Sequence, residues 1–573
     1  MSRDYNFLWS IFLLLLVSQL PIFVQQTLTP DTVLYDIQAR CLLNGGVLYR
    51  DVLEPNLPGI VWVHAVVRTF IGWSSPAFLG FDLLVVLAIS LLLSRLATSA
   101  AASQQQRHLI HAAVLPGALL FYFSTSEWCH CQRDTWMLLP CLLALMIRIN
   151  VLQRMKVACV AVRKTWVRLF VLAMLEGVCW AVGFWLKPFV AVPALAVLIG
   201  SLRFSPTVRV WSLHALAVLC GGVLTGIVGV VWMIQSGCWP HFLDMVSNWN
   251  GDYFQAGRSR WTWDRFISHA FRFQPWIFLH FVALIISVRT LGIRSTSASV
   301  SSTTAHDIVG NLLAALYLGW IAQAFFLQQL FDYIHVPGIL LALTICIRGA
   351  CPFPASGGRQ PSGTQTPPAT SNIATALQNL IMPATIAFAC LVIASSPVFR
   401  WHRQRLWLPC VRACLGTPLS PEFRDKMAQI PFPRWNELQP MLDYARQIGI
   451  ADKSLMAYNG NLIHLYPELG FQPATRFVYL DVLARNFPNR RELMISALEN
   501  SPVRYVVSDL REDGWEGDIP DAVLLPPAVA EHHAELCFPY NQTPLFRSGG
   551  YVLFRMDQPV TRLSSNYLPL AKP

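Results

Sequence analysis

The sequence predicts a mainly α-helical, polytopic transmembrane bundle followed by a small C-terminal α/β domain. Only 13% of the 573 residues are charged and 54% are apolar, with a mean hydropathy of +0.44, whereas soluble domains average about 25% charged residues. Apolar runs recur as far as residue 394, and the chain has the composition of a soluble domain from about residue 431 onward. The net charge of +11 is typical of basic cytoplasmic loops, and no basic and aromatic face indicates nucleic-acid binding.

Apolar runs of the length that crosses the hydrocarbon core, about 20 residues, predict about eleven spans. No small-residue cleavage site follows the first run, so we expect a retained helix rather than a signal peptide. The expected spans are Phe7–Val24, Phe78–Leu96, Leu109–Phe123, Thr135–Ile149, Leu169–Trp185, Val190–Leu202, Trp211–Ile234, Pro275–Val288, Ile308–Phe326, Val336–Ile347 and Ala376–Ala394.

One further apolar run, Ile60–Ile71, is interrupted by His64 and Arg68. These polar residues favour a helix lying at the outer interface of the membrane over a full span. A full crossing is the alternative, and it would invert the orientation of every later loop.

The distribution of Lys and Arg predicts the orientation. Residues Arg148–Arg168 carry several basic residues and no acid, so this loop is expected to be cytoplasmic. Counting spans from there places the loops Asp31–Pro58, Glu127–Asp134 and Asp332–His335 outside. Residues 349–372, rich in Pro, Ser, Thr and Gly, are expected to form a disordered cytoplasmic linker. We therefore expect a transmembrane domain over residues 1–396 and an outer-face α/β domain over residues 397–573.

The C-terminal segment contains alternating strand-like and helical patterns but no Gly-rich phosphate loop and no nucleophile elbow. At about 140 residues, it predicts one small domain. The strand-like runs are Ser454–Tyr458, Val503–Ser508 and Tyr551–Arg555, and the helical patterns are Leu438–Ile448 and Arg490–Asn500.

Asp31 follows the first span by a few residues, after Pro30, where we expect the first helix to have ended. A carboxylate at the membrane surface can meet the head group of a lipid and can deprotonate a hydroxyl group, an effect typically worth about 10²–10⁴ in rate. The alternative is a structural role as the cap of a helix that begins near Val33. Both roles can coexist.

Glu127 and Asp134 bound the second outer loop. Together with Asp31 they could orient an acceptor or hold a divalent cation. The alternative for Asp134 is that it caps a helix starting at Thr135 and pairs with Arg133. The cysteines of this loop, at positions 129 and 131, favour a disulfide to Cys41 or Cys238 over a metal site, because the other metal ligands are missing.

Three further residues could contact a lipid phosphate. Lys187 ends an expected span before Pro188, and Tyr333 and His335 begin another. A buried lysine can act as a point charge for phosphate, and the other two side chains can donate hydrogen bonds to its oxygens. The alternatives are a lysine that extends toward the interface and ordinary interfacial anchors.

Four segments of the chain resemble GT-C superfamily glycosyltransferases. They read TPDTVLYDIQARCLLNGGVLYRDVLEPNLPGIVWVHAV, EWCHCQRDTWMLLP, WLKPFVAVP and FDYIHVPG. The resemblance extends from Phe7 to Pro337. Within the superfamily, this part of the chain is similar to protein O-mannosyltransferases and lipid A aminoarabinose transferases. Their order and sidedness carry the resemblance, because no single motif is specific.

The resemblance implies an inverting transfer of a hexose or pentose from a polyprenyl-phosphate donor to a lipid, glycan or protein acceptor. The reaction would take place at the outer face of a bacterial inner membrane, with the C-terminal domain outside. Asp31 matches the catalytic carboxylate, and Asp134 or Glu127 matches the acid of the second loop. Lys187 and the pair Tyr333 and His335 match phosphate-binding positions.

The sequence departs from the family pattern at two places in the first outer loop. Thr32 stands where the family often has a second acid, and Glu54-Pro55-Asn56-Leu57-Pro58 stands where it often has Lys-Pro-Pro. The second departure removes a cation, so phosphate binding is expected to fall to Lys187 or Arg133.

Two other function classes compete with a glycosyltransferase. A transporter or flippase of a lipid-linked glycan usually has internal repeats and charges near the membrane midplane. No repeat is visible here, and we expect the charges in outer loops. A non-catalytic scaffold would depend on its C-terminal domain and not on Asp31.

Overall fold

The structure is a computed structural model that describes residues 2–99, 101, 103–157, 163–259, 261–271, 273–292, 305–328, 331–350, 391, 405–430, 432–512, 524–525, 537–560 and 563. The chain divides into two compact units. The first contains residues 1–25, 76–228 and 261–415, and the second contains residues 26–75, 229–260 and 416–573. Almost all of the expected linker at 349–372 and of the expected span Ala376–Ala394 lies outside the described residues, as does the expected domain boundary at residue 397.

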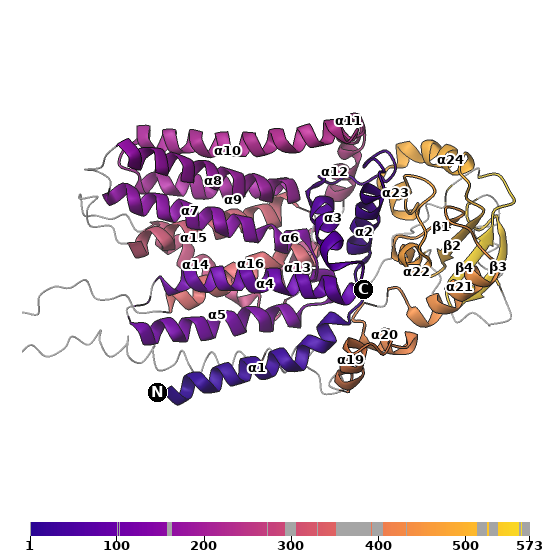
Figure 1. Cartoon of the computed structure of the whole chain (residues 1–573), viewed down its shortest axis with the longest axis horizontal. Helices are drawn as coiled ribbons and strands as arrows, with labels where there is room; N and C mark the ends of the chain where they lie inside the picture. The colour runs from indigo at the N-terminus through magenta and orange to yellow at the C-terminus, as the bar shows by residue number, and fades with distance from the viewer. Residues whose placement is uncertain are drawn as a thin grey trace, which may run out of the picture. The chain divides into compact units, whose positions relative to one another are not determined.

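The first unit is a bundle of long helices that run side by side (Figure 1). Short 3₁₀ and π segments lie at the ends of several of them. Its elements are α1 (Ser2–Val24), α4 (Ser75–Thr98), α5 (Gln104–Ser124), η1 (Glu127–Cys129), α6 (Arg133–Trp136), α7 (Leu138–Val157), α8 (Arg163–Leu186), η3 (Pro188–Val190), α9 (Ala191–Ser201), η4 (Leu202–Phe204), α10 (Val208–Gln235, which continues into the second unit), α13 (Trp263–Ala270), α14 (Phe278–Gly292), α15 (Ala305–Ala322), η6 (Gln323–Leu327), η7 (Asp332–His335), α16 (Val336–Gly349) and α19 (Trp407–Cys414).

Six helical segments within the described residues are long and apolar enough to cross a membrane: Ser75–Thr98, Arg133–Met155, Trp166–Leu186, Val208–Gln235, Asp307–Leu327 and Asp332–Gly349. The protein is therefore an integral membrane protein with a mainly helical fold. Each expected span except Ala376–Ala394 contains a helix, but the total of about eleven crossings stays a prediction, because several helices are short.

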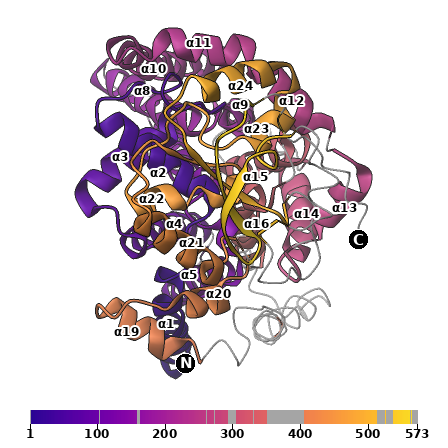
Figure 2. The same cartoon turned by 90° about the vertical axis from the view of Figure 1, so that its right-hand side faces the viewer.

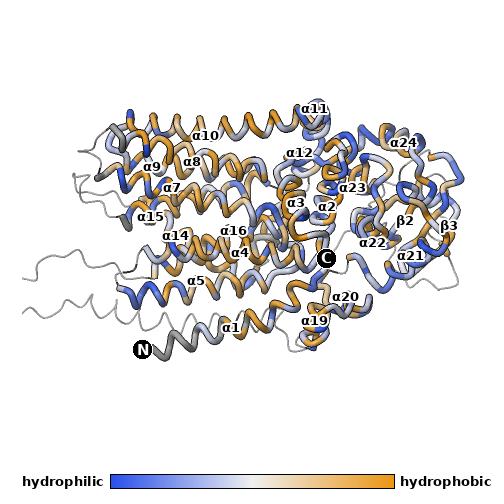
Figure 3. The backbone as a smooth tube through the Cα atoms, in the orientation of Figure 1, coloured by the Kyte–Doolittle hydropathy of each residue, from blue (hydrophilic) through white to orange (hydrophobic). Residues whose placement is uncertain are grey.

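Figure 3 colours each residue by its hydropathy, with hydrophobic residues in orange and hydrophilic residues in blue. Apolar residues run along the bundle helices, and α10 leaves Leu219, Ile227 and Val228 more than half exposed. Exposed apolar side chains all along a helix are typical of contact with lipid. Inside the bundle, Nε of Arg148 on α7 lies 3.0 Å from Oε1 of Glu176 on α8, and both side chains are 1% exposed. This pair fixes the register of the two helices.

The second unit combines the first outer loop with the C-terminal segment. Its elements are α2 (Pro30–Leu43), α3 (Gly59–Ile71), α11 (Trp239–Asn248), α12 (Asn250–Ser259), α20 (Pro421–Met427), α21 (Trp435–Gln447), β1 (Leu455–Ala457), η9 (Gly460–Leu462), α22 (Leu465–Leu469), α23 (Asp481–Asn486), η10 (Pro488–Arg490), α24 (Arg491–Glu499), β2 (Tyr505–Asp509), β3 (Thr543–Ser548) and β4 (Tyr551–Arg555).

The strands form one sheet in the order β1-β2-β4-β3. β1 pairs parallel with β2, whereas β4 pairs antiparallel with β2 and β3. Helix α21 packs against β3 and β4 (Figure 2). The three predicted strands and both predicted helices are confirmed to within a few residues. β3 is a strand that the sequence analysis did not predict.

Hydrogen bonds join the C-terminal segment to the chain just before α2. Nε2 of His464 donates to the carbonyl oxygen of Leu28 over 2.8 Å, and Nε1 of Trp435 donates to Oγ1 of Thr27 over 3.0 Å. Further along, the backbone N–H of Leu53 donates to the carbonyl of Arg476 over 2.8 Å. The C-terminal domain therefore fixes both ends of the segment that contains Asp31.

Helix α3 buries most of its apolar side chains and exposes two of them. His64 and Arg68 are buried, while Val66 is 57% and Phe70 is 84% exposed. With 13 residues, the helix is too short to cross the hydrocarbon core by itself. An exposed apolar stripe on a short helix agrees with the expected location at the membrane interface.

Candidate active site

Asp134 and Lys187 form a buried ion pair in the first unit. Nζ of Lys187 lies 2.7 Å from Oδ1 and 2.9 Å from Oδ2 of the carboxylate. Asp134 stands in the first turn of α6, and Lys187 lies in the break between α8 and η3, where Pro188 prevents the helix from continuing. The relative exposure of the two side chains is 0% and 7%, so solvent hardly screens the attraction.

The ion pair contradicts two alternatives that the sequence left open, one for Asp134 and one for Lys187. Gln132 is the N-cap of α6, so Asp134 does not cap a helix at Thr135. The partner of its carboxylate is Lys187 rather than the adjacent Arg133. Lys187 is buried, so it does not extend toward the interface. Sequence reasoning missed the contact because 53 residues separate the two side chains.

Other predicted site residues come from elements that contact this pair. Segment η7, which carries Tyr333 and His335, packs against α6 and against η1, which begins at Glu127. Nζ of Lys187 lies 5.8 Å from the centroid of the Tyr333 ring. Glu127, Arg133 and His335 are all less than 9% exposed. The structure thus brings the six predicted site residues of the first unit together, five of them buried and Tyr333 partly exposed.

A second buried carboxylate, that of Asp82, accepts a hydrogen bond from α6. Oδ1 of Asp82 on α4 accepts from Nε1 of Trp136 over 2.6 Å, and Oδ2 accepts from the Tyr122 hydroxyl over 2.6 Å. All three side chains are at most 3% exposed. Fully paired buried polar groups hold a segment in one orientation. Asp82 was missed, although a lone acid inside an apolar run is a signal that the sequence contains.

His130 in the second outer loop is neutral and structural. Burial lowers its pKa to about 4, and its ring centroid lies 4.7 Å from that of Phe23 and 5.0 Å from that of Tyr122. Neither Cys129 nor Cys131 beside it forms a disulfide in the structure, and the same holds for Cys41 and Cys238. The expected disulfide of this loop is therefore wrong in this structure.

Asp31 belongs to the second unit and lies in the first turn of α2. Pro30 begins this helix instead of ending the previous one, which ends at Val24. Thr29 is the N-cap, and its Oγ1 accepts from the N–H of Thr32 over 3.3 Å. Asp31 is thus not the capping residue, and its charge at a helix N-terminus is favourable.

Tyr479 of the C-terminal domain lies near two carboxylates of the first outer loop. Burial raises the pKa of Tyr479 well above its usual value, and the charges of Glu54 and Asp31 act in the same direction. Both carboxylates therefore belong to one electrostatic environment in the second unit. Sequence analysis gave no role to Tyr479, and its position between the expected helices carried no signal.

A buried network holds α2 and α3 together. Oδ1 of Asp36 lies 2.9 Å from Nδ1 of His64 and accepts from Nε of Arg68 over 2.8 Å. Arg68 also donates from NH1 to the carbonyl of Ser74 over 2.9 Å. Burial opposes ionisation of Asp36, but the hydrogen bonds and charges of His64 and Arg68 outweigh it and lower the pKa. The sequence signal for this network was the spacing of four residues between His64 and Arg68, which places both side chains on one face of an apolar helix.

No group of three or more His, Cys, Asp or Glu side chains in the described part of the chain could hold a metal ion. The carboxylate of Asp134, one of the acids that could have contributed to such a site, accepts from Lys187.

No protein-family model matches the sequence, and the comparison with curated proteins gives no match. Among solved structures, the chain is similar to ArnT from Cupriavidus metallidurans bound to undecaprenyl phosphate, with 12% identity and a TM-score of 0.46 over 97% of this chain and 98% of that chain. It is also similar to the oligosaccharyltransferase AglB from Archaeoglobus fulgidus in complex with an inhibitory peptide and a dolichol-phosphate. That match has 11% identity and a TM-score of 0.44 over 88% of this chain and 70% of that chain.

Both neighbours are GT-C superfamily membrane glycosyltransferases. That is the class that the four motifs of this chain resemble. At 11–12% identity and TM-scores below 0.5, the likeness assigns no role to any residue of this chain.

Proposed function

We propose that the protein is an inverting glycosyltransferase that moves a sugar from a polyprenyl-phosphate donor to an acceptor hydroxyl at the outer face of a bacterial inner membrane. The observation that carries the proposal is the convergence of Glu127, Asp134, Lys187 and His335. Each of these residues lies at the end of a bundle helix or between two of them, and all are buried in one polar region. Buried ionisable residues in a membrane bundle mark functional sites.

The hydrogen bonds from His464 and Trp435 support a location of the C-terminal domain on the same side of the membrane as the first outer loop. A segment that contacts Leu28 and Thr27 must lie on the same side of the membrane as the first outer loop. The basic loop Arg148–Arg168 favours the cytoplasm, and the expected spans counted from it support an outer location for Asp31 and the C-terminal domain.

Asp31 would act as the base. Its carboxylate takes the proton of the acceptor hydroxyl while the acceptor oxygen attacks the anomeric carbon. The bond between that carbon and the phosphate oxygen breaks, and the polyprenyl phosphate leaves with the electron pair. Attack from the face opposite to the leaving group inverts the anomeric configuration.

The leaving phosphate gains negative charge in the transition state and needs donors. Arg133, Lys187, Tyr333 and His335 would supply them. Asp134 neutralises Lys187, and Arg133 would add a second cationic donor. Asp134 would then act as a positioning residue that holds the Lys187 ammonium group, and Glu127 would orient the acceptor.

Transfer of a radiolabelled sugar from its polyprenyl phosphate, in proteoliposomes that contain the purified chain and a membrane extract as the acceptor source, tests the proposal. Asp31→Asn should lower the transfer rate by a factor of about 10²–10⁴, because the amide cannot take the proton. Asp443→Asn, at an exposed carboxylate of α21, is the matched control and should keep the wild-type rate. A wild-type rate for Asp31→Asn would exclude this residue as the base.

Transport of a lipid-linked glycan is the second candidate function. The buried pair of Arg148 and Glu176 between α7 and α8 favours it, because intramembrane charges are common in transporters. The same proteoliposomes distinguish the two: movement of the labelled lipid between leaflets without a glycosylated product would favour transport.

A further inference from the structure

Two arginines of the C-terminal segment lie over one tryptophan of the second unit. Cζ of Arg476 lies 5.2 Å and Cζ of Arg490 lies 5.6 Å from the centroid of the Trp249 ring, which follows α11. Both distances are within the range of a cation–π contact. Trp249 is 1% exposed, so the ring is held firmly by the residues around it. One aromatic side chain therefore keeps two positive charges near each other.

Aromatic packing fixes this arrangement. The centroid of the Trp249 ring lies 5.0 Å from that of Phe487 in a T-shaped contact and 6.0 Å from that of Phe477. Cζ of Arg476 also lies 5.2 Å from the Phe477 centroid. Side chains that are ordered before a ligand binds lose less conformational entropy on binding. The two arginines are thus prepared to bind a common partner.

The charge of the two arginines is only partly balanced. NH1 of Arg476 lies 3.9 Å from Oδ2 of Asp244 on α11, and among the described residues this is the one carboxylate within 4 Å of either guanidinium group. The Asp244 carboxylate also accepts from Nδ2 of Asn248 over 2.8 Å and from Nε1 of Trp249 over 3.3 Å. Burial lowers the pKa of Arg476, and the charge of Arg490 acts in the same direction, against that of Asp244. The two cations therefore repel each other, and one acid leaves them a net positive charge.

Arg490 has a donor that the described residues do not use. Its NH2 donates to the carbonyl of Asn248 over 3.0 Å, but its Nε is buried and has no hydrogen-bond partner among these residues. A buried donor without an acceptor destabilises a protein. An anionic oxygen beside this guanidinium group would accept from it and would reduce the repulsion from Arg476. Phosphate suits the arrangement, because guanidinium groups bind its oxygens through paired, charge-assisted hydrogen bonds.

The position of these residues along the chain favours a lipid phosphate. Helix α11 begins at Trp239, four residues after the end of α10, which is long and apolar enough to cross a membrane. Helix α11 therefore begins near a membrane surface. It exposes Leu243 and Val246, and α12 exposes Phe254. Short helices with exposed apolar side chains are typical of segments at the head groups of a bilayer, where basic residues attract anionic lipids.

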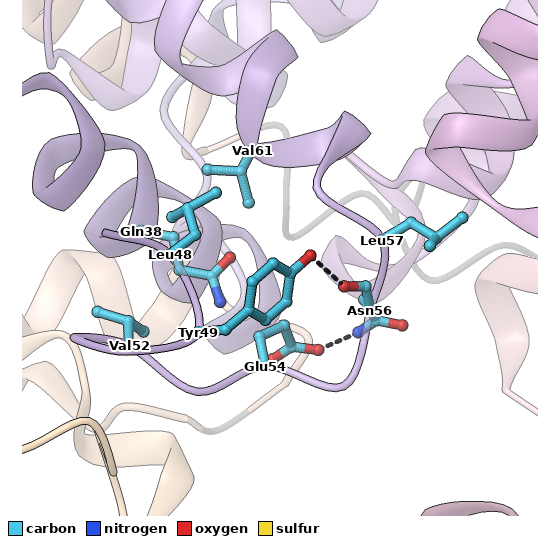
Figure 4. Close-up of a pocket in the computed structure, with 8 residues that line it drawn as sticks. All are labelled: Gln38, Leu48, Tyr49, Val52, Glu54, Asn56, Leu57 and Val61. Carbon is cyan, nitrogen blue, oxygen red and sulfur yellow. Dashed lines mark hydrogen bonds between the residues drawn. The ribbon is translucent and has the colours of Figure 1, made fainter. Parts of the chain in front are cut away.

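The backbone of Arg476 is joined to the first outer loop, since the N–H of Leu53 donates to its carbonyl over 2.8 Å. That loop is itself closely packed (Figure 4). The Tyr49 hydroxyl donates to the carbonyl of Asn56 over 2.9 Å, and Nδ2 of Asn56 donates to Oε1 of Glu54. The space between these side chains is about 10 Å³, which is room for about one water molecule. Arg476 therefore extends from a backbone that a compact loop holds in place.

We propose that Arg476 and Arg490 bind the phosphate of an anionic phospholipid at the membrane surface where α10 ends. The phosphodiester oxygens accept from the two guanidinium groups, and Trp249 keeps these groups in position. The bound lipid also steadies the first outer loop, through the bond from Leu53 to Arg476. This lipid site goes beyond the proposed sugar transfer and does not depend on it.

Native mass spectrometry of the detergent-solubilised full chain tests the proposal. Titration with phosphatidylglycerol, which is anionic, or with phosphatidylcholine, which is zwitterionic, gives the dissociation constant of the first bound lipid. We expect phosphatidylglycerol to bind at least about fivefold more tightly, because each basic residue near a membrane surface contributes about that factor to the attraction of an anionic lipid. Ammonium phosphate at the concentration of the lipid provides the free anion and should leave the bound lipid in place.

Substitutions identify the residues that bind the lipid. Arg476→Gln and Arg490→Gln should each weaken phosphatidylglycerol binding about fivefold, and the double variant should lose the preference over phosphatidylcholine. Arg446→Gln makes the same change at an exposed arginine of α21 and should keep the wild-type constant. Asp244→Asn removes the competing carboxylate and should tighten phosphatidylglycerol binding about fivefold. A poorly folded variant would not bind more tightly, so this last variant separates the lipid site from a loss of structure.

Three results would overturn the proposal. The first is equal binding of the two lipids by the wild-type chain. The second is an unchanged constant for phosphatidylglycerol in the double variant, or weaker binding in Asp244→Asn. The third is displacement of the lipid by an equal concentration of ammonium phosphate, which would indicate a site for the free anion instead.

Discussion

Lys187 donates to both carboxylate oxygens of Asp134, over 2.7 and 2.9 Å, inside a helical bundle where neither side chain is more than 7% exposed. Removal of one partner from a buried pair leaves an uncompensated charge, which typically costs about 3–5 kcal/mol. Two residues that we expected to act separately, on phosphate and on acceptor, are thus one structural unit.

We expect Lys187→Met to lower the free energy of unfolding of the detergent-solubilised protein by about 3–5 kcal/mol. The double variant Lys187→Met/Asp134→Leu should recover much of that loss, because no charge is left without a partner. Denaturant unfolding followed by tryptophan fluorescence measures both. Arg446→Met, which breaks the exposed pair with Asp443, is the control and should cost less than about 1 kcal/mol. Equal losses in the single and double variants would contradict a coupled pair.

The network around Asp36 should stabilise the contact of α2 with α3 in a pH-dependent way. The folded pKa of Asp36 lies below its ordinary value of 3.8. The stabilisation of the folded state by Asp36 is therefore complete above about pH 5 and is lost as the pH falls through the lower folded value. Hydrogen exchange of α2 and α3 peptides should therefore accelerate toward pH 3, after correction for the intrinsic rate. Asp36→Asn and Arg68→Met should each remove this acid dependence, and an unchanged profile in both would exclude the network as its source.

Glu512 should make the C-terminal domain less stable as the pH rises. Burial raises its pKa to about 9, and the charges of Asp481 and Asp509 add to the effect. The folded state keeps the proton while the unfolded chain, with a value of 4.5, releases it, so stability falls between about pH 4.5 and 9. Glu512→Gln should slow hydrogen exchange in β2 and β4 at pH 8, with a gain that disappears toward pH 4.5. Glu499→Gln, at an exposed position of α24, should show no such gain.

Two glycines allow α8 and α10 to approach closely. A Cβ atom at Gly177 would overlap the carbonyl oxygen of Val218, and one at Gly221 would overlap that of Met174. Small residues at a helix contact are typical of membrane bundles. Gly221→Val should therefore lower the thermal unfolding midpoint by several degrees. Gly226→Ala on the same helix has open space around the added atom and should have little effect. Equal midpoints for the two variants would contradict the close contact.

Hydropathy predicted most of the bundle because a helix in lipid must satisfy its own backbone, which leaves a long apolar run. The same signal was weaker in the C-terminal domain. β3 was missed because all of its residues are only partly buried and Pro544 lies within it, so it lacks the alternation that marks a strand. Its neighbour β4 is buried at four consecutive positions and was predicted.

The candidate site was predictable as a list of residues and not as a set of contacts. Asp134 and Lys187 stand out because charges are rare beside apolar runs, but nothing local shows that they meet. The start of α2 was misplaced for a different reason. Pro30 was taken as the end of a helix, whereas proline also fits the first turn of one, where its missing N–H has no partner to lose.

The bond from His464 to Leu28 joins positions that are 436 residues apart in the chain. During synthesis the bundle helices emerge long before the domain that anchors the segment in front of Asp31. A nascent or truncated polypeptide would therefore have its hydrophobic core in the bilayer while this carboxylate is still without its anchor. The segment that contains Asp31 would then reach its final position only after the C-terminal domain has been synthesised and has folded.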